Sequence, residues 1–316
     1  MLHAGIDIGG TTIKAGLVDS QNNTIVIERS TAFPKSGYKN VCLTVGEMIK
    51  NMAEEKGIRL ELLGSIGIAV PGSIDPAGNR VVHAYNLGFH DAPIKEEIMA
   101  GFPGIPVFLA NDADAAALAE LHGGVFMGAK TAVLITIGTG VGGGLILNGK
   151  MFRGGNGQGV ELGHMMLIYG GEPCSCGNNG CVEAYCSATW LAEQGKRILR
   201  SGSGILLRRM AEDQEDHVDA KLVIDAAKQG DPLAQGVFEV FIDNLSAAIT
   251  SITSLLDPEI IAIGGGVGES GDFLYGPLNK AVKEKSFFKA NYKIVPASLG
   301  NKAGMVGAAL LYRNEF

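Results

Sequence analysis

The 316-residue sequence is poor in charged residues, has no excess of basic ones, and has few cysteines. Lysine and arginine total 26 against 33 aspartates and glutamates, which gives a formal net charge of −7. This acidic balance argues against a protein that binds nucleic acid or an anionic membrane surface. The 46% of hydrophobic residues excludes a disordered chain, and the length allows two domains that each bury a core.

The sequence also shows neither a secretion signal nor a membrane helix. The start, MLHAGIDIGG, lacks a basic segment followed by a long apolar one. The longest uncharged stretch, residues 131–149, contains six glycines and three threonines, which favours two strands around a glycine turn. Three of the five cysteines lie within residues 174–181, which indicates a metal site in a reducing compartment. We therefore expect a cytoplasmic protein with no membrane partner.

Glycine is the abundant residue, with 46 of 316 positions, about twice the usual ~7%. Three glycine-rich segments follow predicted strands, at residues 7–18, 136–147 and 261–270. The first two share the order strand, Gly/Thr turn, strand, which suggests two related half-domains. Glycine lets the backbone approach a ligand closely, so three such loops favour nucleotide binding.

Between the glycine turns, the hydrophobic patterns predict an α/β protein. Strands are expected at the alternating or buried apolar segments, which are AGIDIGGTTIKAGLVD, TIVIERSTAF, GSIGIAVPG, VFLAND and YKIVPAS. Helices are expected at 40–57, after Asp112, over 182–200, over VDAKLVIDAAKQG, from Asp231–Pro232 to Asp257–Pro258, and as an amphipathic C-terminal helix over 300–313.

The first glycine turn carries groups that suit a phosphate and a metal ion. Its backbone N–H groups and threonine hydroxyls can bind phosphate oxygens, and an aspartate just ahead can hold Mg²⁺ directly or through water. The residues are Asp7, Gly9, Gly10, Thr11, Thr12 and Lys14. An ordinary hairpin with an exposed acid and lysine is the alternative. The turn does not follow the G-x-x-x-x-G-K-[ST] pattern, which argues against a P-loop NTPase.

Asn111 and Asp112 lie where a predicted strand meets a predicted helix. Asn and Asp commonly cap helix N-termini, which is one interpretation of the pair. The other is a general base at the carboxyl end of a strand, where ligands of α/β proteins bind.

A metal site is predicted at His164, Cys174, Cys176 and Cys181, spaced H-x9-C-x-C-x4-C. Three thiolates and one imidazole form a closed tetrahedral set typical of structural zinc. The alternative is a group of buried cysteines near an unrelated histidine. Glu161 and Glu183 flank the set, and carboxylates with a histidine on fixed loops suit a substrate rich in hydroxyls.

These motifs together resemble the ROK family of sugar kinases (repressor, open reading frame, kinase), and the correspondence covers nearly the whole chain. The matching segments, in family order, are DIGGTTIKAGLVD, PGSID, ANDADAAALAE, ITIGTGVGGG, ELGH, CSCGNNGCVE and IGGGV. The resemblance implies an actin/hexokinase-like α/β fold with two ribonuclease-H-like domains around a cleft. It places residues 1–112 plus 300–316 in a small domain. It also places residues 113–299 in a large domain with the zinc knuckle and sugar loops.

The resemblance also implies residue roles. Asp112 is the expected catalytic base. The expected sugar contacts are Gly72, Asn86, Asn111, Glu161, His164 and Glu183. The expected Mg-ATP contacts are Asp7, Gly9, Gly10, Thr11, Thr12, Lys14, Gly138, Thr139, Gly140 and Gly265. Phe89 and Asp114 depart from the tryptophan and asparagine that many family members carry.

The implied activity is ATP-dependent phosphorylation of a hexose, with glucose as acceptor and structural zinc as a second cofactor. N-acetylmannosamine or another hexose is the enzymatic alternative, and polyphosphate is an alternative donor. A sugar-responsive regulator lacking a DNA-binding domain is the alternative of another class. We disfavour it because the first strand begins by about Ala4, leaving no room for a helix-turn-helix. The family resemblance further suggests a homodimer or homotetramer, with sugar and ATP as the small-molecule partners.

Overall fold

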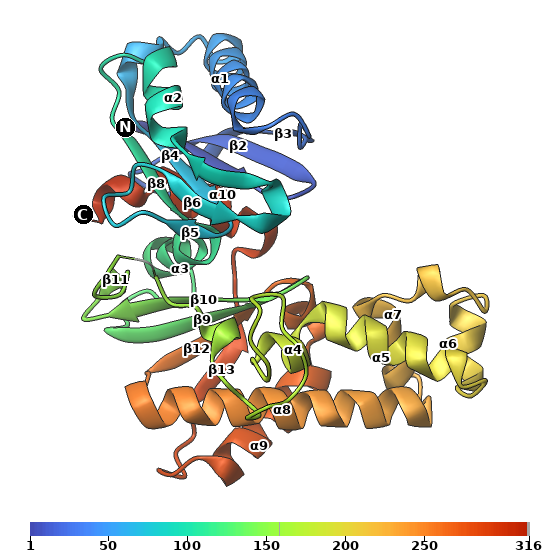
Figure 1. The fold of residues 1–316 in the computed structure, drawn as a ribbon. Coiled ribbons are helices and arrows are strands. Elements are labelled where there is room, and N and C mark those ends of the chain that lie inside the picture. The colour runs from blue at the N-terminus through green and yellow to red at the C-terminus, as the bar shows by residue number, and fades with distance from the viewer. Residues whose placement is uncertain (158, 315–316) are drawn as a thin grey trace. The chain divides into compact units, whose positions relative to one another are not determined.

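The computed structural model describes residues 1–157 and 159–314 (Figure 1). Contacts between residues divide the chain into two compact units. Unit 1 comprises Met1–Lys130, Gly144–Val160 and Ser298–Phe316, and unit 2 comprises Thr131–Gly143 and Glu161–Ala297. By these contacts, the helix that begins at Asp112 belongs to unit 1. The division into domains at residue 112, expected from the family resemblance, stays a prediction.

Unit 1 contains a five-stranded sheet in the order β3-β2-β1-β4-β8. β1 pairs with β2 antiparallel and with β4 parallel, and β4 pairs with β8 parallel. The elements of this part are β1 (Leu2–Ile8), β2 (Thr12–Asp19), β3 (Thr24–Ala32), α1 (Tyr38–Glu55), β4 (Leu63–Val70), β5 (Ser73–Ile74), β6 (Val81–Ala84), β7 (Phe89–Ala92), α2 (Ile94–Gly101), β8 (Val107–Asn111), α3 (Asp112–Gly123), β11 (Lys150–Phe152) and α10 (Ala303–Ala309). The strands and the helix predicted from the N-terminal sequence are confirmed.

Helix α1 shows how the apolar pattern forms the core of unit 1. Val41, Val45, Ile49 and Met52 recur at helical spacing and are all buried. They join a cluster that includes Ile6, Ile68 and other residues of the sheet strands. Removing the Ile49 side chain beyond Cβ would cost about 2–5 kcal/mol, as for other buried aliphatic residues.

The C-terminal helix differs from its prediction, because it is shorter and is not amphipathic. The α-helical part covers only α10, with short 3₁₀ helices at Gly300–Lys302 and Leu311–Arg313. Its residues are almost all buried against α3, β1 and β4. The packing is close: a Cβ added to Gly67 would lie 1.8 Å from the Ala308 carbonyl oxygen. A helix with neighbours on several sides is apolar all round, so the amphipathic pattern fails here.

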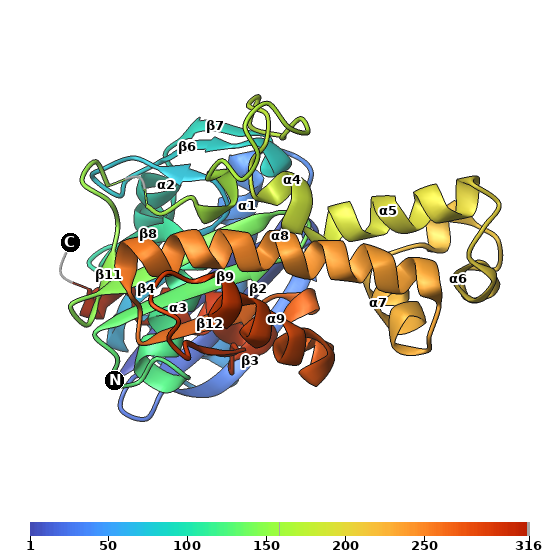
Figure 2. The ribbon, with the colours of Figure 1, turned by 90° about the horizontal axis from the view of Figure 1, so that it is seen from below.

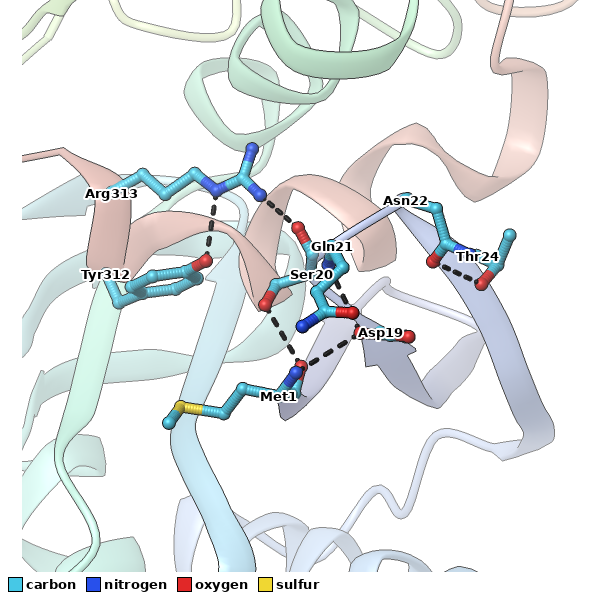
Figure 3. Close-up of polar contacts among 8 residues, drawn as sticks. All are labelled: Met1, Asp19, Ser20, Gln21, Asn22, Thr24, Tyr312 and Arg313. Atoms are coloured by element: carbon cyan, nitrogen blue, oxygen red, sulfur yellow. Dashed lines mark hydrogen bonds and ion pairs between the residues drawn. The ribbon is translucent and has the colours of Figure 1, made fainter.

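Polar contacts join the two ends of unit 1's sequence (Figure 3). The Arg313 guanidinium donates to the Ser20 carbonyl oxygen, and its Nε donates to Tyr312 Oη at 3.0 Å. The Ser20 hydroxyl donates to the Met1 carbonyl oxygen at 3.0 Å. The Met1 ammonium lies 3.3 Å from Asp19 Oδ1. The residues after α10 are thereby fixed to the β2–β3 connection.

Unit 2 contains most of the second sheet and a group of helices. The sheet order is β11-β10-β9-β12-β13, and β12 pairs in parallel with both β9 and β13. The elements are β9 (Thr131–Ile137), β10 (Val141–Leu147), α4 (Glu183–Cys186), α5 (Ala188–Arg200), α6 (Ile205–Met210), α7 (Ala220–Lys228), α8 (Pro232–Leu256), β12 (Ile260–Gly264), α9 (Asp272–Lys285) and β13 (Lys293–Pro296). β10 begins in unit 2 and ends in unit 1. Figure 2 shows α5, α6 and α7 grouped at one end of the long helix α8.

Local signals explain several helix ends in unit 2. Asp231 accepts N–H hydrogen bonds from Leu233 and Ala234 at 3.0 and 3.1 Å, so it caps α8 as predicted. Asp257, at φ 41°, ends the same helix. The predicted helix over 182–200 is interrupted, since Ser187 is extended and caps α5 separately from α4.

The predicted similarity of the two halves is confirmed as sheet topology. Both five-stranded sheets consist of a three-stranded antiparallel meander followed by two parallel strands. The small sheet β5-β6-β7 was not predicted, because its strands have only two to four residues and produce little alternation. In the parts of the chain that the structure describes, no helix combines the length and apolar character needed to cross a bilayer.

Candidate functional site

The β1–β2 turn of unit 1 carries the first predicted phosphate motif. Gly9, Gly10 and Thr11 connect the two strands, and Gly10 and Thr11 are exposed at the tip. The Gly9 N–H donates to the Thr12 carbonyl oxygen at 2.9 Å and closes the turn. The Phe33 N–H donates to the Thr11 carbonyl oxygen at 2.9 Å, which supports the turn from the end of β3. The hairpin is confirmed, and phosphate binding by it stays a prediction.

Charged groups lie at the base of this turn. Asp7 in β1 is the register partner of Lys14 in β2. Burial, and secondly the charge of Asp112, raise the pKa of Asp7 to about 6, against the opposing effect of Lys14. The Lys14 ammonium donates to the Asn301 carbonyl oxygen at 3.0 Å. Two interacting carboxyl groups in partly buried surroundings are favourable for binding a divalent cation.

Asn111 and Asp112 connect β8 to α3. Asn111 is the helix N-cap: its Oδ1 accepts from the Ala113 N–H at 2.8 Å, and its Nδ2 donates to the Gly72 carbonyl oxygen at 3.0 Å. Burial raises the pKa of the Asp112 carboxyl, while hydrogen bonds from the Ala113 and Asp112 N–H groups oppose the shift. The capping interpretation is therefore confirmed for Asn111. It leaves the general-base role of Asp112 open, since a raised pKa suits proton abstraction near neutral pH.

Gly72 and Asn86, two predicted sugar contacts, lie in the same unit. Gly72 has φ 101°, and an added Cβ would lie 2.0 Å from the His83 carbonyl oxygen, so only glycine fits. Asn86 is exposed in the 3₁₀ helix Tyr85–Leu87, and a Cβ added to Gly10 would lie 3.8 Å from its Nδ2. The structure therefore places Asn86 beside the β1–β2 turn and Gly72 beside Asn111.

In unit 2 the second and third glycine loops lie next to each other. The Gly138 N–H donates to the Gly140 carbonyl oxygen at 3.0 Å in the β9–β10 turn. Gly265 follows β12 with φ 81°, and an added Cβ would lie 2.3 Å from the Ile137 carbonyl oxygen. Any other residue at Gly265 would force this loop away from the end of β9. The structure thus brings together the predicted nucleotide contacts of unit 2.

The start of α5 holds the β9–β10 turn through contacts that the sequence did not reveal. The Ala188 N–H donates to the Gly138 carbonyl oxygen at 2.8 Å. The Thr189 hydroxyl donates to the Thr139 carbonyl oxygen at 2.7 Å. The available signal was Ser187, whose hydroxyl accepts from the Trp190 N–H at 3.1 Å as a helix cap.

The predicted metal ligands converge within unit 2. Ligand atoms of His164, Cys174, Cys176 and Cys181 all lie within 4.8 Å of one another. His164 Nδ1 is 3.6 Å from Cys174 Sγ, and the sulfurs of Cys176 and Cys181 are 3.7 Å apart. Two thiolates bound at about 2.3 Å to one tetrahedral zinc would lie about 3.8 Å from each other. The four residues therefore fit one metal ion.

The two glutamates beside this cluster have different surroundings. Glu161 is exposed, and its carbonyl oxygen accepts from the His164 N–H at 3.1 Å. The Glu183 carboxylate has three partners: Oε2 accepts from the Val141 N–H at 3.0 Å, while Oε1 accepts from the Ser175 hydroxyl at 2.7 Å and lies 3.8 Å from Cys174 Sγ. Ser175 and Val141 were not predicted as site residues, because hydrogen bonds over 8 and 42 positions leave no local sequence signal.

Comparison with known proteins identifies the class. The model of the ROK family matches residues 3–315. A glucokinase of Thermotoga maritima is 34% identical over 318 residues, covering 98% of this chain and 97% of the relative. An N-acetyl-D-glucosamine kinase of Pasteurella multocida is 30% identical, covering 98% of this chain and 99% of the relative.

A solved structure gives the same result. The ROK family glucokinase from Streptomyces griseus, in complex with glucose and AMPPNP, matches with a TM-score of 0.84 and 31% identity. The match covers 98% of this chain and 99% of that one. The chain belongs to the ROK family, with the actin/hexokinase-like fold of its sugar kinases. The resemblance inferred from the motifs is thus confirmed.

Proposed function

We propose that the protein is an ATP-dependent hexose kinase that transfers the γ-phosphoryl group of Mg-ATP to the 6-hydroxyl of glucose. The observation that carries the proposal is Asp112, a carboxyl of raised pKa at the junction of β8 and α3, electrostatically coupled to Asp7. The glucokinase relatives of similar length support glucose as the acceptor.

In this proposal Asp112 accepts the proton of the attacking hydroxyl. Phosphoryl transfer depends on positioning and charge neutralisation more than on covalent participation by the protein. Asp7 would hold Mg²⁺, directly or through water, and Lys14 would balance the negative charge nearby. In unit 1, amide groups of the β1–β2 turn, with the hydroxyls of Thr11 and Thr12, would bind phosphate oxygens, and in unit 2 amide groups of the β9–β10 turn would do the same.

The proposed sugar contacts are polar groups with remaining hydrogen-bonding capacity. The Asn111 amide uses one acceptor and one donor within the protein, which leaves a second N–H and a lone pair for a sugar hydroxyl. Glu161 and Asn86 are exposed, and Glu183 Oε2 can accept a further hydrogen bond beside that from the Val141 N–H. His164 would use Nδ1 for the metal, leaving Nε2 for the sugar and fixing the ring tautomer.

The proposed metal at the Cys₃His set is zinc. Four protein ligands leave no open coordination position, so the ion's contribution when bound is structural. The backbone N–H of Asn178 lowers the pKa of the Cys176 thiol, which favours the thiolate that metal binding requires. The residues of this segment would then hold His164 and the neighbouring glutamates in place.

The proposal is tested by measuring ADP release with Mg-ATP and a panel of glucose, N-acetylmannosamine, N-acetylglucosamine, mannose, fructose and allose. We expect kcat/KM to be highest for glucose. A maximum at another hexose would overturn the substrate assignment while retaining the kinase. Absence of sugar-dependent ADP release with every acceptor, and with polyphosphate as donor, would overturn the kinase itself.

An N-acetylhexosamine, in particular N-acetylmannosamine, is the second candidate acceptor. The N-acetyl-D-glucosamine kinase relative supports it, since its identity is only slightly below that of the glucokinases. The same base and metal ligands would serve either acceptor, so the panel above decides between them.

The proposed setting is cytoplasmic sugar phosphorylation at the entry to glycolysis. None of the five cysteines, all of which lie within the described residues, forms a disulfide, which is consistent with a reducing compartment. We further propose a homodimer or homotetramer that binds sugar and ATP but no nucleic acid. Light scattering of the purified protein would test the assembly.

A further inference from the structure

The metal-ligand segment and the β9–β10 turn are joined by one side chain. The Glu183 carboxylate accepts from the Ser175 hydroxyl at 2.7 Å through Oε1 and from the Val141 N–H at 3.0 Å through Oε2. Ser175 stands between the ligands Cys174 and Cys176, and Val141 directly follows the turn residue Gly140. All of these residues belong to unit 2. A continuous path of two hydrogen bonds therefore runs from the metal ligands to the turn.

The Glu183 end of this path fits closely against the turn. A Cβ added to Gly140 would lie 2.3 Å from Glu183 Oε2. The turn is held elsewhere by α5, through the bonds to the carbonyl oxygens of Gly138 and Thr139. Glu183 instead accepts from the N–H of Val141, the first residue after the turn. It therefore fixes the end of the turn at which backbone N–H groups are available to a ligand. Charge-assisted bonds of this kind are about twice as strong as neutral ones.

The metal-ligand end depends on the order of the loop. Ser175 lies in a short exposed segment, in which the Cys174 N–H bonds to the Asn178 carbonyl oxygen at 2.8 Å. Ligation of Cys174 and Cys176 on both sides would restrict where the Ser175 hydroxyl can lie. Without ligation, that hydroxyl would lose its fixed position, and Glu183 Oε1 would lose its shorter hydrogen bond and keep only the 3.8 Å contact with Cys174 Sγ.

We propose that Glu183 is a positioning residue that couples metal occupancy of the Cys₃His set to nucleotide binding at the β9–β10 turn. The coupling rests on the proposed nucleotide role of the turn. Binding of metal and nucleotide is then mutually favourable, and the same factor applies in both directions. Sugar contact by Glu183 is compatible with this role, because Oε2 can accept a second hydrogen bond beside that from the Val141 N–H.

The experiment measures the dissociation constant of Mg-AMPPNP by calorimetry, without sugar, in metal-replete and metal-stripped full-length protein. We expect metal removal to weaken wild-type binding about tenfold, within the usual range of allosteric coupling. Zinc affinity, measured with a chromophoric chelator, should rise by the same factor when Mg-AMPPNP is present. In ¹⁵N spectra the Val141 amide should shift on metal removal.

Ser175→Ala removes the Ser175–Glu183 hydrogen bond without removing a metal ligand or a proposed substrate contact. The remaining contact, between Cys174 Sγ and Glu183 Oε1 at 3.8 Å, cannot donate a hydrogen bond once the thiolate is bound to metal. This variant should keep its metal, bind Mg-AMPPNP as weakly as the stripped wild type, and lose the metal dependence. Ser175→Thr, which keeps the hydroxyl, should restore both the affinity and the Val141 shift. Glu183→Gln should behave like Ser175→Ala, and Glu172→Gln, a charge control on the same exposed segment, should behave like wild type.

The outcomes separate this proposal from the proposed function. If replete wild-type protein fails to bind Mg-AMPPNP, the nucleotide role of the turn is wrong, and the coupling with it. If binding occurs with the same affinity in replete and stripped protein, the kinase proposal stands and the coupling is wrong. Metal dependence that persists unchanged in Ser175→Ala would likewise overturn the path through Glu183.

Discussion

The two hairpins that begin the two sheets have the same topology but different chemistry. Along the hairpins, Asp7 corresponds to Thr136 and Lys14 corresponds to Gly143. The first turn thus has an acid and a base in register across its strands. The second has uncharged residues at both places, and its support comes from Glu183 and the start of α5.

The difference shows how one backbone form can serve two purposes. In unit 1 the strand residues themselves supply charge next to Asp112. In unit 2 the turn presents backbone groups, and other segments determine its shape. The four predictions below test this division of roles, from the largest expected effect to the smallest.

Asp112→Ala should abolish phosphoryl transfer without unfolding the protein. Loss of a general base typically costs a factor of about 10²–10⁴, so we expect kcat below about a hundredth of wild type. Steady-state kinetics and a thermal melt measure the two effects. Asp19→Asn, a half-buried control in the same unit whose carboxylate contacts the Met1 ammonium, should retain full activity. A higher residual rate in Asp112→Ala would show that Asp112 is not the general base beside the β1–β2 hairpin.

Chelation of the metal should affect unit 2 and leave unchanged the β1–β2 hairpin, which carries Asp7 and Lys14. We expect the sugar KM to rise about tenfold, as for other losses of ligand-positioning interactions, together with a lower Tm. Hydrogen exchange should quicken in the β9–β10 turn but not in the β1–β2 turn. If metal loss, confirmed by elemental analysis, changes neither KM nor Tm, the Cys₃His set does not support the site.

Asp7→Asn should lower activity while raising stability at alkaline pH. The folded-state pKa of Asp7 is raised to about 6 from 3.8, so the native state binds the proton more tightly than the unfolded state. Stability is therefore greatest below pH 3.8 and falls as pH rises to 6. Removing the charge should add about 3 kcal/mol to the free energy of unfolding at pH 8. Denaturant titrations at pH 5 and 8 measure the gain, and Thr136→Val, its counterpart in unit 2, should show none.

His3→Gln should remove an acid sensitivity that is specific to the first sheet, since β9 has Ala132 in the corresponding place. His3 is 2% exposed, and its ring stacks on Tyr312 at 3.9 Å. Burial, then the N-terminal ammonium and Arg313, lower its pKa to about 4. Below pH 6.5 the unfolded state takes up the proton first, so stability falls as pH decreases towards 4.

This histidine should cost about 2 kcal/mol at pH 5 relative to pH 8. Denaturant titration of wild type and His3→Gln at both pH values isolates the contribution. An equal loss in the two proteins would assign the acid sensitivity to other groups.

Sequence reasoning succeeded where the signal is local. The α1 periodicity, the Asp231 cap and the glycine turns each depend on residues within a few positions, and all three were predicted. The Cys₃His cluster could be predicted because cysteine is rare in this chain and the spacing of the four residues is short.

It failed where neighbours distant in sequence decide the outcome. Residues 300–313 gave an amphipathic pattern, but α10 is surrounded by α3, β1 and β4. The interruption at Ser187 was missed because its flanking sequences both favour helix. The partners of Glu183 are invisible in the sequence, since they depend on how the ligand segment folds back onto β10.

The late position of α10 has a consequence for biosynthesis. Residues 303–309 cover part of the first sheet against β1 and β4, with backbone as close as Gly67 and Ala308. During translation, the part of that sheet covered by α10 therefore stays exposed until residues 303–309 have left the ribosome. N-terminal domains that fold early avoid this exposure, but here the ribosome-bound intermediate would present an unfinished core to chaperones. Premature termination shortly before residue 303 should accordingly yield an aggregating polypeptide in place of a slightly shortened enzyme.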